Sequence, residues 1–202
     1  MTSTALPFTH EMVVVHKLFR REFAQGPTWV RRVPVGDTKQ AKLVFTHMTK
    51  DFDLLHHHHE AEDINLWPLL RERAADHSAL LDDMEAQHQG IDPALRKAEA
   101  AGAAWAANGG AEQRDAFAAA IEEFSTPLLA HLDQEESDIL PLAQEHLTEE
   151  EWGLLAKHAI ATTPKPDLVK GLGGILEDAT PDEREMMLAV IPAVPKLLYS
   201  AF

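Results

Sequence analysis

Two segments of this chain carry the same arrangement of metal-binding side chains. One runs from His58 to Pro68 and the other from His131 to Pro141, and both read His-x3-Glu-acid-x4-Pro. On an α-helix, residues four apart lie on one face about 6 Å from each other, so an imidazole and a carboxylate can bind the same metal ion. A single His-x3-Glu is common by chance, whereas two copies with matching flanks predict a metal site. The alternative is a pair of buried His–Glu hydrogen bonds, which would bury two carboxylates without a cation at a high cost in free energy.

Helices must position these pairs, because apolar residues recur with helical spacing along most of the chain and strand signals are almost absent. We expect an all-α protein in which residues 1–147 form an up-and-down four-helix bundle. Gly26 and Pro27 are expected to end the first helix, and proline at positions 68, 93 and 127 to bend or interrupt the later ones. The expected helices are residues 9–24, 37–73, 76–105 and a fourth that includes 117–142.

Each helix of the bundle must bring its ligands to the same level. On the first helix, His16 lies on the apolar stripe. On the third helix, His77 and His88 face nearly the same direction. Because this helix runs antiparallel to the second, it reaches the level of Glu62 near His88. The predicted metal ligands are His16, His58, Glu62, His88, His131 and Glu135. His59 and Asp63 lie beside the stripe and are expected to support the ligands, although either could supply an extra one; His47 is expected to be a core or network histidine.

The character of the sequence changes after His146. Residues 148–202 contain short helical pieces separated by proline and glycine, and two capping boxes, Thr148 to Glu151 and Thr180 to Glu183. We expect a helical appendage packed on the bundle. His158 is isolated there and is expected to be a surface or capping residue.

Composition limits the chemistry and the partners. The chain has 202 residues and no cysteine, so a metal must be bound by His, Asp or Glu, which suits iron, manganese or zinc. The formal net charge of -15 argues against nucleic acid and anionic membranes as partners. Neither a signal peptide nor a membrane-spanning run is recognisable, and we expect a cytoplasmic protein.

The ligand pattern resembles the hemerythrin-like (HHE cation-binding) family, bacterial type, over residues 9–146. In that family one His on the first helix, His-x3-Glu on the second, one His on the third and His-x3-Glu on the fourth bind two iron ions. The resemblance implies a di-iron centre with a bridging oxygen, although zinc or manganese could be bound instead. Oxygen-carrying hemerythrins have two histidines on the third helix and an Asp in the fourth-helix motif, whereas this chain has Glu135 at the fourth position of that motif. Ferritin-like bundles use two Glu-x-x-His pairs, and only Glu85 with His88 fits that pattern here.

Three functions remain open from the sequence. The first is a di-iron protein that binds or reacts with a small ligand such as O2, peroxide or NO. The second is an enzyme that decomposes peroxide at the same centre. The third is a helical regulatory or interaction module in which the metal is only structural. Six protein ligands and a bridging oxygen would leave about two coordination positions open on two octahedral ions, which favours a reactive site.

Overall fold

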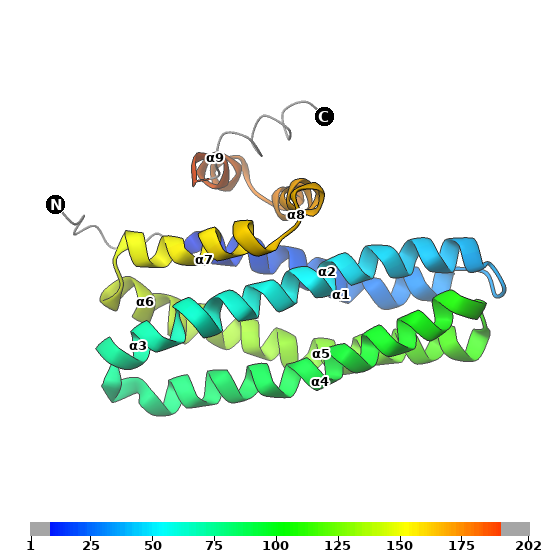
Figure 1. Ribbon diagram of the computed structural model, residues 1–202, viewed down its shortest axis with the longest axis horizontal. Helices are drawn as coiled ribbons and strands as arrows, with labels where there is room; N and C mark the ends of the chain where they lie inside the picture. Colours follow the sequence, from blue (N-terminus) through cyan, green and yellow to red (C-terminus); the bar gives the residue numbers. More distant parts are fainter. Residues whose placement is uncertain (1–8, 191–202) are drawn as a thin grey trace.

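Four long helices form the body of the molecule in the computed structural model, which describes residues 9–190 (Figure 1). They are α1 (His10–Arg32), α2 (Thr38–Asn65), α4 (Ser78–Asn108) and α5 (Ala111–Gln134). α1 packs against α2 and α5, and α4 packs against the same two helices. The all-α, up-and-down bundle predicted from the sequence is therefore confirmed.

Two of the bundle helices change their geometry at the glutamate of the His-x3-Glu motif or just after it. α2 stops at Asn65 and the chain continues as α3 (Trp67–Arg73), with Pro68 in its first turn; a short 3-10 helix, η1 (Ala75–His77), leads into α4. α5 passes through a π-helical turn, η2 (Glu135–Ile139), into α6 (Leu140–His146). The predicted bend near Pro68 is confirmed, and the second repeat has a π-turn at the corresponding place. Such turns are rare and often occur at functional sites.

The predicted end of the first helix at Gly26 and Pro27 is wrong. α1 continues to Arg32 with both residues buried inside it. A proline inside a helix costs about 3 kcal/mol, but Gly26 packs directly on α2, where an added Cβ would lie 2.9 Å from Met48 Cε. The close packing and the burial of Val30 in the last turns offset that cost. α4 and α5 likewise continue through Pro93 and Pro127.

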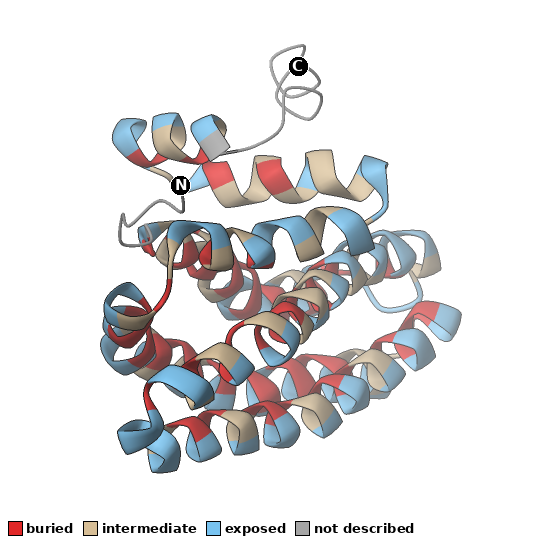
Figure 2. Cartoon of the chain, turned by 60° about the vertical axis from the view of Figure 1, so that its left-hand side comes forward, coloured by how far each residue is buried: buried red, intermediate tan, exposed pale blue. Residues whose placement is uncertain are grey.

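The inner faces of the helices are buried and the outer faces are exposed (Figure 2). Two apolar clusters fill the bundle. One contains Phe19, Phe23, Phe52 and Phe124, and the other contains Trp67 together with residues such as Met12, Met84 and Ile139. Along each helix the predicted metal ligands lie between residues of the two clusters, so the site is enclosed by apolar layers.

Three further helices follow the bundle: α7 (Glu149–Thr162), α8 (Lys165–Glu177) and α9 (Pro181–Val190). α7 packs on α2, α8 on α1 and α2, and α9 on α1. Both predicted capping boxes are present, since Glu151 and Glu183 exchange hydrogen bonds with Thr148 and Thr180. The predicted appendage extends to residue 202, and its last part, 191–202, lies outside the described residues.

Within residues 9–190 no helix combines the length and the apolar character needed to cross a membrane.

Candidate metal centre

The six predicted ligands come together inside the bundle. His16 comes from α1, His58 and Glu62 from α2, His88 from α4, His131 from α5, and Glu135 from the first position of the π-turn η2. His16, Glu62, His131 and Glu135 have no exposed surface, and the other two are nearly buried. The structure thus brings together all six side chains that the sequence grouped as candidate ligands.

Each glutamate lies between histidines of two different helices. Glu62 Oε1 is 3.1 Å from His58 Nε2, and Glu62 Oε2 is 3.4 Å from His88 Nε2. Glu135 Oε2 is 3.3 Å from His16 Nε2 and 3.9 Å from His131 Nε2. Each carboxylate is thus placed to bridge two groups of imidazoles.

The imidazole nitrogens also face one another. His16 Nε2 is 3.3 Å from His58 Nε2, and His88 Nε2 is 3.1 Å from His131 Nε2. Two atoms that bind one ion at about 2.1 Å lie about 3.0 to 3.4 Å apart, for angles between 90° and the tetrahedral value. These nitrogen–nitrogen separations are those of ligands sharing an ion.

The two carboxylates lack well-formed hydrogen bonds, although histidine nitrogens lie close to them. None of the four side-chain oxygens of Glu62 and Glu135 has a hydrogen-bond partner among the described residues. Leaving a buried polar group unpaired costs about 1 to 3 kcal/mol, and more for a charged one. The donor set fits a pair of cations, which would satisfy all four oxygens and the facing nitrogens at once.

A seventh side chain, His59, belongs to this cluster. It is 5% exposed, its Nε2 has no hydrogen-bond partner among the described residues, and its ring stacks on His88 at 4.1 Å. One of its ring nitrogens lies within 4.8 Å of a ring nitrogen of both His88 and His131. The sequence indicated mainly a supporting role, but His59 and Glu62 are three residues apart, which also places them on one helix face.

The donors form two groups of unequal composition. Three histidines, His59, His88 and His131, form one group, while His16 and His58 form the other with Glu62 and Glu135. Because the two glutamates also reach His88 and His131, they lie at the boundary between the groups. The arrangement can hold two ions joined by two carboxylates.

The acidic residue that follows each His-x3-Glu orients a histidine of another helix. Asp63 Oδ1 lies 2.8 Å from His88 Nδ1, and Glu136 Oε1 lies 2.8 Å from His16 Nδ1. A carboxylate at Nδ1 selects the tautomer that donates from Nδ1 and leaves Nε2 as the free metal-facing nitrogen. The whole repeated motif, including its acid, thus contributes to the centre.

Removing one of these orienting acids should weaken metal binding without removing a ligand. We expect Glu136→Ala to lower metal affinity about 10- to 100-fold, because His16 loses the group that fixes its tautomer and ring orientation. The matched control is Asp138→Ala, an exposed acid in the same π-turn whose carboxylate contacts Ser137. Competition with a chelator of known affinity measures the effect, and equal affinities for the two variants would contradict it.

In the metal-free protein the cluster has strongly shifted pKa values. Burial, reinforced by the charge of Glu135, raises the pKa of Glu62 to about 8. Burial also lowers the pKa of His131 to about 4 and lowers that of His58 well below its usual value. Although burial opposes it, the carboxylates of Glu135 and Glu136 raise the pKa of His16 to about 9, and those of Asp63 and Glu62 raise the pKa of His88 to about 10. A charged group is therefore stable in this cavity only beside an opposite charge.

His77 and His47, which the sequence also singled out, lie outside the cluster. His77 is exposed just before α4, whereas His88 lies inside the cluster. His47 is not in the core, since its side chain is 52% exposed, but it does take part in a network on the surface of α1 and α2. Its Nε2 is 2.8 Å from Glu22 and 3.6 Å from Asp51.

Asp51 should make stability depend on pH. Burial, and then the charge of Glu22, raise the pKa of Asp51 to about 7, although His47 and Arg21 act in the opposite direction. The folded protein therefore keeps a proton that the unfolded chain releases near pH 4, so stability falls as the pH rises from about 4 to 7. Asp51→Asn should be more stable than wild type by on the order of 2 kcal/mol at pH 8, with little difference at pH 4.

Urea unfolding at both pH values tests this expectation. Asp53→Asn is the control, because Asp53 is on the same helix with a side chain 59% exposed. The control should change stability by less than about 0.5 kcal/mol at either pH. A gain for Asp51→Asn that is equal at pH 4 and pH 8 would show that titration of Asp51 is not its cause.

Comparison with known proteins agrees with this geometry. The model of one protein family, described as the hemerythrin HHE cation binding domain, matches residues 8–143, which include every residue of the cluster. No curated protein and no solved structure matches the chain significantly. The match covers well over half of the chain, and the chain belongs to the hemerythrin HHE cation-binding domain family.

Proposed function

We propose that this protein binds two iron ions at its centre and uses them to bind or react with a small oxidant such as O2, peroxide or NO. The supporting observation is the convergence of buried imidazole nitrogens on two glutamates whose oxygens have no hydrogen-bond partners among the described residues. The ligands would be the six predicted residues together with His59. Nitrogen and oxygen donors of this kind also suit zinc and manganese.

Counting donors indicates where a small molecule would bind. Five imidazoles and two carboxylates shared by both ions would fill nine of the twelve positions of two octahedral ions, and a bridging oxygen would fill two more. The position left open would lie on the side of His16 and His58, which has two histidines rather than three. An iron pair with one open position supplies reversible redox chemistry to a ligand bound there.

The chain's own residues would keep this chemistry controlled. Apolar layers on both sides of the cluster limit its contact with bulk water, and Asp63 and Glu136 hold His88 and His16 in the tautomer that points Nε2 inward. Gln87 Oε1, 3.1 Å from His131 Nδ1, does the same for a third histidine.

Elemental analysis of protein expressed with ample iron is the direct test. We expect about two iron ions per chain and near-ultraviolet absorption from an oxygen-bridged pair, with spectral changes on adding peroxide or NO. Protein without a bound transition metal would overturn the proposal. Zinc alone, together with a strong loss of thermal stability on chelation, would favour the structural role.

Peroxide decomposition is a second candidate, supported by the same open position. Oxygen release from peroxide by the wild type and by Glu135→Ala distinguishes it from simple binding. A rate that is negligible and equal in both proteins would exclude it.

A further inference from the structure

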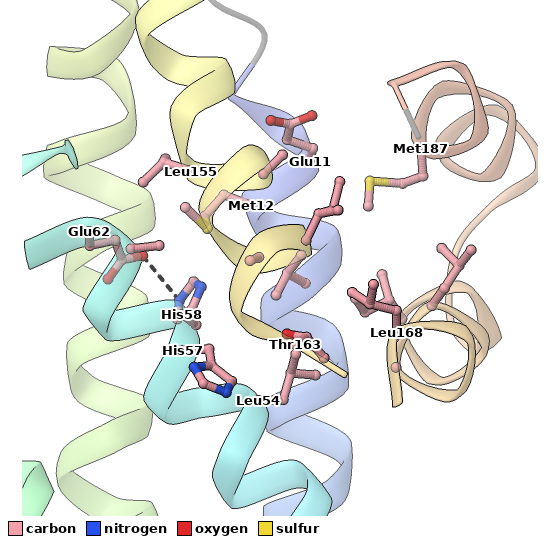
Figure 3. A pocket seen from close by; sticks show the side chains of 18 of the residues that line it. Glu11, Met12, Leu54, His57, His58, Glu62, Leu155, Thr163, Leu168 and Met187 are labelled. Atoms are coloured by element: carbon pink, nitrogen blue, oxygen red, sulfur yellow. Dashed lines mark ion pairs between the residues drawn. The ribbon is translucent and has the colours of Figure 1, made fainter. Parts of the chain in front are cut away.

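An apolar cavity lies between the bundle and the C-terminal helices. Its volume is about 200 Å³, and it is lined by residues of α1, α2, α7, α8 and α9 (Figure 3). Figure 3 shows His58 and Glu62 on one side of this space and Leu168 and Met187 on the other. Two of the candidate metal ligands therefore form part of the cavity wall.

Much of this wall belongs to the part of the chain that follows the family match. The match ends at residue 143, whereas Trp152, Leu155, Leu168 and Met187 all line the cavity. The centre itself is a family feature, but this cavity depends on the appended helices.

Specific contacts hold the appended helices in place. Trp152 Nε1 donates to Glu11 Oε1 at 2.6 Å, and Lys17 Nζ pairs with Glu183 Oε2 at 2.7 Å. Two of the helices that bound the cavity, α7 and α9, are thus tied to α1 by side-chain contacts.

The lining determines the kind of molecule that fits. An apolar cavity of about 150 Å³ in another protein takes up benzene, so this one has room for about six to eight carbon atoms. An anion would meet Glu11 and Glu62 in a chain of net charge -15, and any ion would lose its hydration against the apolar walls. A neutral aliphatic molecule avoids both costs.

The position of His58 and Glu62 indicates how such a molecule would be oriented in the cavity. They are the cavity's point of contact with the candidate centre, on the side with two histidines. We propose that the cavity binds a neutral aliphatic molecule of about six to eight carbons whose single hydroxyl or hydroperoxide end points toward His58 and Glu62. Placement of that end at a metal pair rests on the proposed function, whereas binding of the hydrocarbon part rests on the cavity alone.

Two glycines of α8 offer a matched pair of variants. A Cβ added at Gly171, which lines the cavity, would have Leu54 Cδ2 as its nearest neighbour, at 3.8 Å, so a larger side chain there would fill the space. A Cβ at Gly173 meets nothing within 4 Å, and Gly173 does not line the cavity. Both changes remove one glycine from the same helix, so their effects on helix formation should be alike.

Calorimetric titration with ethanol, 1-butanol and 1-hexanol tests the proposal on metal-free and metal-loaded protein. We expect one saturable site for 1-hexanol, with affinity that rises about four-fold for each added methylene. Gly171→Leu should weaken binding at least about ten-fold and Gly173→Leu less than about two-fold. The absence of saturable binding, or equal effects of the two variants, would overturn the proposal.

The loaded protein tests the direction of the ligand. 1-Hexanol should change the absorption of the metal centre in the wild type and in Gly173→Leu but not in Gly171→Leu. Saturable binding without any spectral change would overturn the placement of the hydroxyl end. If the protein took up no metal, the proposed function would fail. The titration of the metal-free protein would still show whether the cavity binds 1-hexanol.

Discussion

Replacing Glu62 by glutamine is expected to change the stability of the protein in opposite directions with and without metal. Glu62 is fully buried between His58 and His88, and its oxygens have no hydrogen-bond partner among the described residues. An amide cannot bridge two cations as a carboxylate does, so the metal content should fall from the proposed two ions per chain to one or none. The metal-free variant should be about 1 to 3 kcal/mol more stable than metal-free wild type at pH 7, because the Glu62 carboxyl, with its pKa raised by burial to about 8, must take up a proton there on folding.

The matched control is Glu60→Gln, two residues away on the same helix. The side chain of Glu60 is 40% exposed and lies 3.5 Å from His57. This variant should keep the metal content of the wild type and nearly its stability in both states. Elemental analysis and urea unfolding with and without metal measure both effects. Normal metal content in Glu62→Gln would contradict the bridging role, and a less stable metal-free variant would contradict the cost assigned to the buried carboxylate.

The largest expected loss of stability comes from Phe23→Ala. Phe23 is 1% exposed, and its ring centroid lies 4.8 Å from that of Phe124 and 5.8 Å from that of Phe52. Truncating a buried phenylalanine to alanine costs about 3 to 5 kcal/mol, through lost transfer free energy and the cavity left behind. Because three bundle helices meet at this ring, we expect a value in the upper half of that range.

Urea unfolding of the metal-free protein measures this loss apart from any effect on metal binding. Leu43→Ala is the control, since Leu43 is apolar but 64% exposed, and it should cost less than about 0.5 kcal/mol. Phe23→Leu should lie between them and keep the wild-type metal content. Similar losses for Phe23→Ala and Leu43→Ala would show that the aromatic cluster does not stabilise the bundle as its burial indicates.

Much of the centre could be predicted because helices convert sequence spacing into direction and height. His58 and Glu62 share a face through their spacing, and the length of helix needed to return to the same level favours His88 over His77. The place of His59 in the cluster is harder to predict, because its three-residue spacing to Glu62 has no counterpart in the second repeated segment, whereas the four-residue spacing is found in both.

Other features depend on tertiary packing, which sequence spacing does not contain. The continuation of α1 through Gly26 and Pro27 depends on the fit of Gly26 against Met48. The π-turn that begins at Glu135 cannot be recognised from the sequence, because the repeated motif reads the same in the segment that lacks such a turn. The apolar cavity forms only where α7, α8 and α9 dock on α1 and α2, and no motif marks that docking.

The unequal division of histidines has a consequence for the order of metal loading. The position at His59, His88 and His131 is richer in nitrogen, while the position at His16 and His58 depends more on the shared carboxylates. Imidazole favours iron and zinc, whereas carboxylate oxygen accommodates manganese more readily. A chain that fills both positions should therefore fill them in sequence, passing through a form with one ion at the three-histidine position. When more than one metal is present, binding of the second ion determines whether the two bound ions are the same metal or different metals.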